Sequence, residues 1–456
     1  MKDLNTAIRK LATIFFFFAL ITGCNSKLNK ESDLAISSNT EELNVMKARP
    51  NIVIIVADDQ GYADASFQQY HPAEISTPAI DQLASQGMVF TNGYSSAYVC
   101  APTRAGLLTG RYQQRFGFYR ARDSRAGMPL NEKTLAQYLK EENYTTGVFG
   151  KWHIGLDYEY RPLQRGFDEF YGFLGHGAHS YFDLTCNSGD KHGCIYRNND
   201  IINDEGYLTD VLAEESVKFI GAHAKDDNPF LLYLPFNAVH WPLEAPEEDV
   251  ARYNTGNGDR DIMLGMLYRM DHAIERVVNK LKETGQYENT LLIYFSDNGG
   301  AAKISANNAP LRDYKQSTYE GGIRVPFIIS WPEQISPGES EEPVISLDIL
   351  PTIFEAIGKP LPTDRILDGK SLIPVLRGTQ DGPLHNQLFW DGDEGKWSVR
   401  EGDFKLVHTK SGALELYNLK ADIGESENII SSNQVIAGRL ESAYNKWRGE
   451  MGKPMK

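Results

Sequence analysis

Five short, mostly apolar runs separated by longer stretches with helical periodicity constrain the fold of this chain most strongly. The first run, Asn51–Ala57 (NIVIIVA), is apolar without interruption after its first residue, which predicts a strand buried on both faces of a sheet. Further runs follow at Thr146–Phe149, Phe230–Leu234, Leu291–Phe295 and Val325–Ser330. Between them, apolar residues three and four positions apart predict helices around Leu135, Tyr138 and Leu139, and along Met263, Leu267, Met270, Ile274, Val277 and Leu281. Strands that alternate with helices predict an α/β fold with a mostly parallel sheet covered by helices on both faces.

The pattern changes from about residue 380. Trp397–Arg400, Lys405–His408 and Leu414–Tyr417 read as short alternating strands with glycine turns between them, and Ile430–Trp447 reads as a closing helix. We therefore expect a large domain over residues 49–380 and a smaller α+β domain over residues 381–456.

Polar side chains follow four of the predicted strands. Asp58, Asp59 and Gln60 come after the first, Lys151 to His153 after the second, Asn237 and His240 after the third, and Asp297 to Gly300 after the fourth. In open α/β sheets, ligands bind at the carboxyl ends of the strands. Each group alone is most simply a polar loop or a helix cap, but the four together predict one shared site.

The first residues are typical of an export signal. Lys2, Arg9 and Lys10 precede the apolar segment Leu11–Ile21, which is short for a membrane-spanning helix. The run ends in Ile-Thr-Gly-Cys at Cys24, which resembles a bacterial lipobox, although simple cleavage near Gly23 is the alternative. We expect a lipoprotein-type signal peptide over residues 1–23, lipidation of Cys24 and a flexible tether over residues 24–48. The mature protein is then exported, to the periplasm or as an outer-membrane lipoprotein.

The charge of the chain excludes one class of partner. The formal net charge is −15, and removal of residues 1–23 makes the chain more acidic still. A protein this acidic does not bind nucleic acid by electrostatic attraction. We expect membrane contact only through the lipid anchor, and an anionic substrate would need a local basic pocket.

The chain has four cysteines. With Cys24 assigned to lipid, Cys186 and Cys194 lie eight residues apart in a polar loop, where an oxidising compartment would permit either a small disulfide or two free thiols. Cys100 is left alone. Pro102 suits the first turn of a helix, so Cys100 is predicted at a helix N-terminus, where backbone N–H groups favour an anion, with Arg104 adding a positive charge. The residues indicate an anion-binding nucleophile, or else a buried structural cysteine.

The stretch from Cys100 to Arg111 resembles the signature of the sulfatase family in the alkaline phosphatase superfamily, C/S-x-P-x-R-x-x-x-L-T-G-R, at every fixed position. The resemblance runs from about Pro50 to the C-terminus. It includes the Asp-Asp pair, Lys-x-His, the later histidine, Asp-Asn-Gly, and a lysine ahead of Glu-Gly-Gly-x-Arg-Val-Pro, in the family order. It implies an alkaline phosphatase-like fold and hydrolysis of sulfate esters.

The resemblance also implies a role for each matching residue. Cys100 would be oxidised to formylglycine by a formylglycine-generating or sulfatase-maturating enzyme. Arg104 would stabilise the hydrated aldehyde, Lys151 and Lys315 would bind sulfate, His240 would protonate the leaving alcohol, and His153 would act as the base in the step that expels sulfate. The ligands of one Ca²⁺ would be Asp58, Asp59, Asp297 and Asn298, all hard oxygen donors.

Three alternatives compete with this interpretation. Two-zinc phosphomonoesterases and phosphodiesterases use Ser or Thr and require further Asp and His ligands, which the sequence does not offer. Formylglycine-dependent phosphonate or phosphate ester hydrolases are nearer rivals, but the Lys-x-His stretch, Lys315 and the lipoprotein-like export favour a sulfatase. A catalytically dead surface glycan-binding protein would not need the intact set of polar groups.

The expected substrate is a sulfated polysaccharide or oligosaccharide: a galactan such as carrageenan, a glycosaminoglycan or a mucin glycan. Two stretches rich in basic and aromatic residues are candidates for binding it, with solvated loop charge as the plain alternative. Arg122 represents the first, which also holds Arg115, Tyr119, Arg120 and Arg125; His176 and His179 represent the second, with Tyr181.

Overall fold

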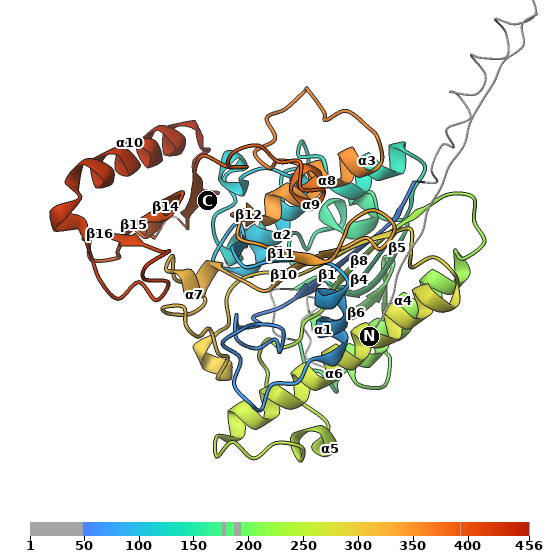
Figure 1. Ribbon diagram of the computed structural model, residues 1–456. Coiled ribbons are helices and arrows are strands. Elements are labelled where there is room, and N and C mark those ends of the chain that lie inside the picture. The colour runs from blue at the N-terminus through green and yellow to red at the C-terminus, as the bar shows by residue number, and fades with distance from the viewer. Residues whose placement is uncertain (1–48, 176–178, 187–192, 393, 456) are drawn as a thin grey trace, which may run out of the picture. The chain divides into compact units, whose positions relative to one another are not determined.

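A ten-stranded sheet is the centre of the protein in the computed structural model, which describes residues 49–175, 179–186, 193–392 and 394–455 (Figure 1). The strand order is β11-β2-β10-β9-β1-β8-β4-β5-β6-β7. The bounds are β1 Asn51–Ala57, β2 Met88–Phe90, β4 Thr145–Lys151, β5 Glu169–Phe173, β6 Ile195–Arg197, β7 Asp200–Ile202, β8 Phe230–Pro235, β9 Thr290–Ser296, β10 Phe327–Ser330 and β11 Gly338–Ser340.

The five central strands, β9, β1, β8, β4 and β5, are parallel neighbours. Ile54 in β1 is in register with Tyr233 in β8 and with Ile293 in β9, so the carboxyl ends of these strands lie at one edge. The mostly parallel sheet is thus confirmed. The run expected at Val325–Ser330 differs in detail, because β10 begins at Phe327 and pairs antiparallel with both β9 and β2.

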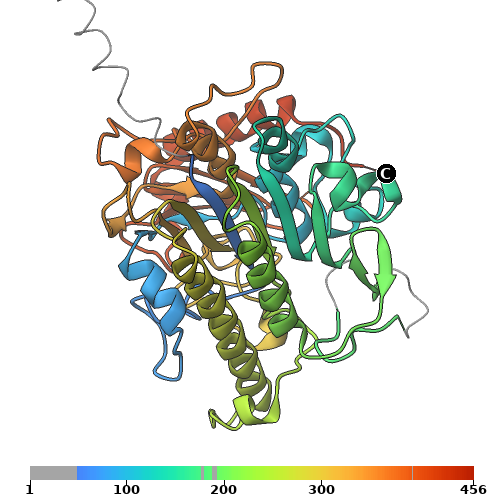
Figure 2. The same cartoon turned by 90° about the vertical axis from the view of Figure 1, so that its right-hand side faces the viewer.

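Both faces of the sheet are covered, as the uninterrupted apolar strands predict. Ile52, Ile54 and Val56 of β1 belong to a core with helices α2 (Cys100–Thr109), α3 (Leu135–Glu141), α8 (Ile349–Ala356) and α9 (Ile373–Leu376). The alternate residues of β1 belong to a second core with α1 (Pro78–Ser85), α4 (Leu208–Ala222) and α6 (Gly258–Glu283). Figure 2 shows α4 and α6 lying side by side across this second face.

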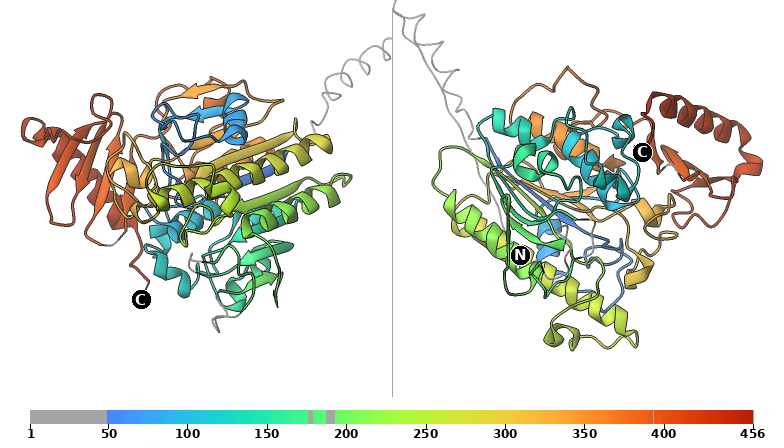
Figure 3. Two further views of the ribbon diagram at one scale, coloured as in Figure 1. Left: turned by 90° about the horizontal axis from the view of Figure 1, so that it is seen from below. Right: turned by 180° about the vertical axis from the view of Figure 1, so that it is seen from behind.

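A small antiparallel sheet and one helix make up the C-terminal part, beside the large sheet (Figures 1 and 3). Trp397 of the sheet stacks on Tyr444 of the helix, with ring centroids 3.8 Å apart. The strands are β13 Leu388–Asp391, β14 Trp397–Glu401, β15 Phe404–His408 and β16 Leu414–Asn418, and the helix is α10 Gln434–Glu450. The remaining elements are a two-stranded pair, β3 Gly93–Tyr94 with β12 Val344–Ile345, and the short helices α5 Glu247–Val250 and α7 Glu320–Ile323.

Two further features concern the ends and loops of the chain. Cys186 and Cys194 form a disulfide, with Cα atoms 4.6 Å apart. Among the described residues, no helix has both the length and the apolar character needed to cross a membrane. The expected signal peptide, Cys24 and the tether lie outside the described residues.

Candidate active site

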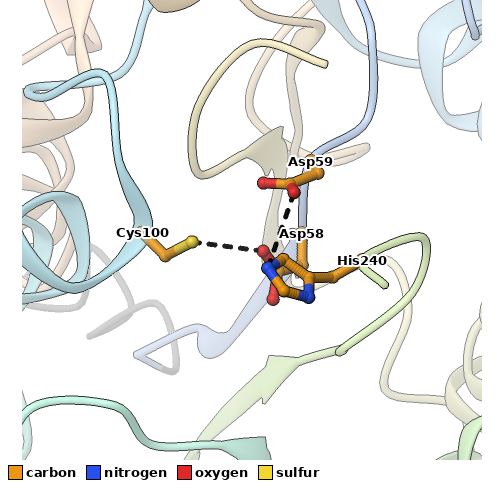
Figure 4. A group of neighbouring side chains, drawn as sticks. All are labelled: Asp58, Asp59, Cys100 and His240. Carbon is orange, nitrogen blue, oxygen red and sulfur yellow. Dashed lines mark hydrogen bonds and ion pairs between the residues drawn. The ribbon is translucent and has the colours of Figure 1, made fainter. Parts of the chain in front are cut away.

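Side chains from three parallel strand ends and one helix N-terminus meet at the carboxyl edge of the sheet. Asp58 and Asp59 follow β1, His240 follows β8, and Cys100 is the first residue of α2. One donor atom from each of these four residues lies within 4.8 Å of the others (Figure 4). Asp297 and Asn298, which follow β9, belong to the same cluster. Arg104 donates to Asp297, and Asn298 donates to Asp59. The structure therefore brings together the groups that the sequence placed after separate strands.

Three cations balance the carboxylates of this cluster, of which Arg104 and Lys151 are buried and Lys315 is partly buried. Arg104 is fully buried and donates from Nε and Nη2 to Oδ2 of Asp297, at 2.9 and 2.6 Å. The Lys151 ammonium contacts Oδ2 of Asp58. Lys315 Nζ donates to Oδ1 of Asp59 at 2.6 Å. Burial opposes ionisation of Asp58, but Lys151 and the other nearby cations hold its pKa well below the usual range.

The surroundings of Cys100 keep its thiol protonated. Its side chain is 2 % exposed, and its Sγ lies 3.4 Å from Oδ1 of Asp58 and 3.1 Å from Lys315 Nζ. Burial and the carboxylates of Asp297 and Asp58 raise the pKa of the thiol to about 12, despite the nearby lysines. A neutral thiol is a weak nucleophile at neutral pH.

Two buried oxygen atoms in this cluster are without a hydrogen-bond partner among the described residues, Oδ1 of Asp297 and Oδ1 of Asn298. A buried polar oxygen without a partner is costly, by about 1–3 kcal/mol. The Nδ2 of Asn298 donates to Oδ1 of Asp59 at 2.8 Å, and Arg104 holds Oδ2 of Asp297 at 2.6 Å. Four hard oxygen donors with three negative charges suit a divalent cation such as Ca²⁺, so these residues fit the metal that the sequence led us to expect.

The two histidines have different surroundings. His153 is buried, and neither of its ring nitrogens has a hydrogen-bond partner among the described residues. Burial, together with Lys151 and Arg104, holds its pKa well below the usual value, so its ring is neutral. The His240 side chain is 18 % exposed. Its Nδ1 lies 2.7 Å from the carbonyl oxygen of Trp241, which makes Nδ1 the donor there and leaves Nε2 3.6 Å from Oδ2 of Asp59. Burial lowers the pKa of His240, although Asp59 and Asp58 oppose that shift.

Backbone geometry at the cluster is unusual at two non-glycine residues. Asp59 and His153 have φ angles of 63° and 60°, in the left-handed region. Such conformations are unfavourable for these residues and are concentrated at functional sites. Close packing adds a further constraint: a Cβ on Gly299 would lie 1.9 Å from the carbonyl oxygen of Gly321, so the turn that carries Asp297 and Asn298 requires glycine there.

Two supporting residues hold turns of the site: Asn308, which was not singled out from the sequence, and Tyr181, which was named there only among the candidates for binding substrate. Tyr181 donates to the carbonyl oxygens of Asn237 and His240, at 2.6 and 2.9 Å, and so holds the turn that presents His240. Asn308 bonds both the N–H and the carbonyl oxygen of Gly300. Neither residue belongs to a motif, and only the folded chain brings them to the site.

The expected substrate-binding residues are dispersed. Arg122 is exposed. Arg115 pairs with Asp368 at 2.7 Å, and Arg120 pairs with Asp123 at 3.0 Å. His179 is buried, with its ring centroid 4.9 Å from that of Phe173. His176 lies outside the described residues.

Comparison with known proteins agrees with this geometry. The sulfatase family profile matches residues 50–359, and a profile described as N-sulphoglucosamine sulphohydrolase, C-terminal, matches residues 313–447. The chain is similar to arylsulfatase A of Homo sapiens, at 32 % identity over 84 % of this chain and 83 % of that protein. It is also similar to the uncharacterized sulfatase YdeN of Escherichia coli, at 28 % identity over 91 % of this chain and 88 % of that protein.

A solved structure extends the comparison to three dimensions. The crystal structure of Ps i-CgsB in complex with k-i-k-neocarrahexaose superposes with a TM-score of 0.84 and 35 % identity, over 89 % of this chain and 94 % of that one. The match extends over most of both chains, so the alkaline phosphatase-like fold expected from the sequence is confirmed. The chain belongs to the sulfatase family, and it is an enzyme that hydrolyses sulfate esters.

Proposed function

We propose that this sulfatase removes sulfate from sulfated oligosaccharides or polysaccharides, with a formylglycine made from Cys100 and one bound Ca²⁺. The observation that carries the proposal is the cluster itself. Cys100 stands at a helix N-terminus among Asp58, Asp59 and His240, and Lys315 reaches its Sγ at 3.1 Å. Groups that can bind an anion, neutralise its charge and transfer protons thus surround the side chain of Cys100.

Asp58, Asp59, Asp297 and Asn298 would hold the calcium ion. Bound there, Ca²⁺ would supply Lewis-acid polarisation of a sulfate oxygen and lower the pKa of the hydrated aldehyde. The two unpartnered oxygens, Oδ1 of Asp297 and Oδ1 of Asn298, support this assignment because they are buried acceptors without a donor among the described residues.

Formylglycine at position 100 accounts for both transfer and release of sulfate, whereas a thiol does not. The hydrated aldehyde carries two hydroxyl groups on one carbon, so that one attacks sulfur and the other permits sulfate to leave with the aldehyde restored. The thiol of Cys100 has a pKa of about 12 in its buried surroundings and would remain protonated. Arg104 would stabilise the formylglycine at position 100. Its guanidinium is held in place by Asp297, and its Nη1 donates to the carbonyl oxygen of Lys151 at 3.0 Å.

Lys151 and Lys315 would hold the transferred sulfate. Both ammonium groups lie within the cluster and contact the carboxylates of Asp58 and Asp59, respectively. Burial alone would lower the pKa of Lys315, but Asp59 and its neighbours keep that pKa well above the usual value, so the group stays charged. Fixed cations in a dry site stabilise the charge that develops in the transition state.

The histidines would move protons. His240 would present Nε2 to the leaving alcohol, because its Nδ1 is held by the carbonyl oxygen of Trp241. His153 would accept the proton of the second hydroxyl group, since its neutral ring has both nitrogens unengaged by the described residues. A general base must be unprotonated before it acts.

Substrate class and location are part of the same proposal. Ps i-CgsB was crystallised with k-i-k-neocarrahexaose, and we extend a sulfated-glycan substrate to this chain, with sulfated galactans, glycosaminoglycans and mucin glycans as the classes to compare. The sequence supports export as a lipoprotein anchored at Cys24, in the periplasm or at the outer membrane. A formylglycine-generating or sulfatase-maturating enzyme would be the partner that modifies Cys100.

One experiment tests the activity and the modification together. Purified protein is offered a panel of defined sulfated oligosaccharides and matched phosphate and phosphonate esters, while mass spectrometry reads the peptide that holds Cys100. We expect sulfate release from the sulfated glycans, formylglycine in the peptide, and no turnover after Cys100→Ala. Turnover by protein with wholly unmodified Cys100 would contradict the mechanism, and preference for the phosphonate ester would assign the site to the rival reaction.

A further inference from the structure

A second hollow lies directly beside the candidate nucleophile. Its volume is about 230 Å³, below the roughly 300–1,000 Å³ of pockets that hold drug-sized ligands. Two of its lining residues are chain neighbours of catalytic candidates, since Val99 precedes Cys100 and Gln316 follows Lys315. Gly392 and Glu394, which follow β13, also line the hollow. The lining residues used below are Tyr98, Val99, Arg122, Gln316, Gly392 and Glu394.

Hydrogen bonds fix this hollow relative to Cys100. The N–H of Gln316 donates to the carbonyl oxygen of Tyr98 at 3.0 Å, which joins the Lys315 loop to the residues ahead of Cys100. Lys396, from the C-terminal part, donates to the carbonyl oxygen of Gln316 at 2.7 Å. A group bound in the hollow would therefore have a defined position relative to the reacting carbon.

One cation in the lining is uncommitted. Arg122 is exposed, and no hydrogen bond or ion pair joins it to any residue that the structure describes. The other charges of the lining are paired: Arg120 with Asp123 at 3.0 Å, and Glu394 with Lys396 at 3.5 Å. Asp393 lies outside the described residues. The hollow thus offers one free guanidinium, whose planar fork matches a sulfate or carboxylate group.

We propose that this hollow, here called the Arg122 pocket, binds a second anionic group of the saccharide whose sulfate ester is cleaved. The inference rests on the proposed function and deepens it, because it names the substrate as one that carries two anionic groups close together. The second group is a sulfate ester or a carboxylate. Since the pocket adjoins the Cys100 and Lys315 segments, the two groups belong to the same sugar or to directly linked sugars.

The test compares three matched oligosaccharides that carry the scissile sulfate ester alone, with a neighbouring sulfate, or with a neighbouring uronate carboxylate. We expect the wild-type enzyme to prefer one of the two dianionic substrates through a lower KM. Arg122→Gln should reduce that preference about tenfold, in line with loss of one charge-assisted bond. Which dianionic substrate is preferred identifies the second group as sulfate or carboxylate.

Two variants act as controls. Arg125→Gln removes an exposed cation three residues away that does not line the Arg122 pocket, and it should keep the wild-type preference. Glu394→Gln removes an anion from the lining and should increase the preference. Equal preference in the wild type and in Arg122→Gln, with both proteins folded by circular dichroism, would overturn the proposal, as would the same loss in Arg125→Gln.

A binding measurement on an inactive variant tests the Arg122 pocket independently of the proposed catalytic function. In Cys100→Ser protein, isothermal titration calorimetry with the same three oligosaccharides should show tighter binding of the preferred dianionic substrate, and the added Arg122→Gln change should abolish the difference. If the wild type releases sulfate from no substrate, the proposed function fails, and calorimetry alone then decides the pocket. No difference in affinity among the three oligosaccharides would refute the pocket.

Discussion

Arg104 donates twice to a single carboxylate oxygen of Asp297, Oδ2, at 2.9 and 2.6 Å, and leaves Oδ1 of Asp297 buried without a partner among the described residues. The guanidinium thus engages one oxygen of the carboxylate and leaves the other available as a ligand. This division of one carboxylate between two tasks is the geometric reason to expect a metal ion there.

Calcium should therefore bind and stabilise the protein. We expect about one calcium per chain by elemental analysis, and a rise in Tm on adding Ca²⁺ to chelated protein. A ligand at 100 times its Kd contributes about 2.7 kcal/mol to the free energy of unfolding. Asp297→Asn should lose both the metal and the shift, whereas the exposed Asp227→Asn should keep them. Two tightly bound zinc ions per chain would point to the phosphodiesterase branch.

Loss of His240 should depend on the leaving group. A sugar hydroxyl needs a proton to leave, whereas an activated phenolate does not. General acid catalysis contributes roughly 10²–10⁴-fold, so His240→Ala should cost about that much in kcat/KM on a sulfated sugar and far less on an activated aryl sulfate. Lys315→Ala should impair both, because both substrates present the same sulfate. Equal losses on both substrates for His240→Ala, in folded protein, would refute the acid role.

The stability of the fold should depend on pH through Asp271. This carboxylate in α6 accepts hydrogen bonds from the N–H groups of Ala79 and Ile80 in α1, at 3.0 and 2.9 Å. Burial outweighs those bonds and raises its pKa from the ordinary 3.8 to about 6. Because the folded pKa is the higher one, the contribution to stability is fully present below pH 3.8 and is lost as pH rises through 6.

The matched variant for this effect is Asp271→Asn, which carries no charge at any pH. The difference in free energy of unfolding between wild type and variant should change by about 3 kcal/mol in total from well below pH 3.8 to well above pH 6, measured by urea unfolding. Parallel stability curves across that range would show that the Asp271 pKa is not raised.

Lys405 should be essential to the C-terminal sheet. Its buried ammonium lies 2.8 Å from Glu320 and 3.0 Å from Glu425, which are buried too. Removing one member of such a group leaves uncompensated buried charge, at a cost of about 3–5 kcal/mol. Lys405→Met should lower Tm accordingly, while the exposed Lys410→Met should not. A Tm within 2 °C of wild type would contradict the assigned role of Lys405.

Lipidation at Cys24 is a separate prediction. Cells that express the full chain and are fed a clickable palmitate analogue should label the wild type and not Cys24→Ser, since no other residue in the first 48 offers a thiol. Fractionation should place the wild type with membranes and the variant with soluble protein. Equal labelling of the wild type and Cys24→Ser would contradict lipidation at Cys24 and leave secretion after simple signal cleavage as the interpretation.

The central strands β1, β8 and β9 were predictable because each is almost wholly apolar, which is the pattern of a strand buried on both faces, whereas β5 was not predicted from the sequence. The cluster at their carboxyl ends was predictable for the same reason: parallel strands end together, so Asp58, His240 and Asp297 must converge. The fold class and the enzyme class are confirmed, whereas the roles of the individual residues stay predictions.

What was not predictable depends on contacts between distant segments. The antiparallel direction of β10 follows from its pairing with β2, which lies more than 200 residues earlier in the chain. His179 looked like a candidate for binding substrate, yet it packs against Phe173 inside the fold. The hydrogen bond between Lys396 and Gln316 joins two loops, and nothing in the sequence of either loop predicts that they are in contact.

The burial of Cys100 also sets an order of events in biosynthesis. At 2 % exposure, its side chain is out of reach of any modifying enzyme once the sheet has closed. The sheet cannot close until β9 exists, because β9 pairs with the whole length of β1 and ends at Ser296. At about 5–20 residues per second, translation from Cys100 to Ser296 takes roughly 10–40 seconds. On the proposed function, conversion of Cys100 to formylglycine would therefore have to be completed while the chain is still open, and a maturation enzyme that is scarce relative to synthesis would leave folded, permanently inactive protein.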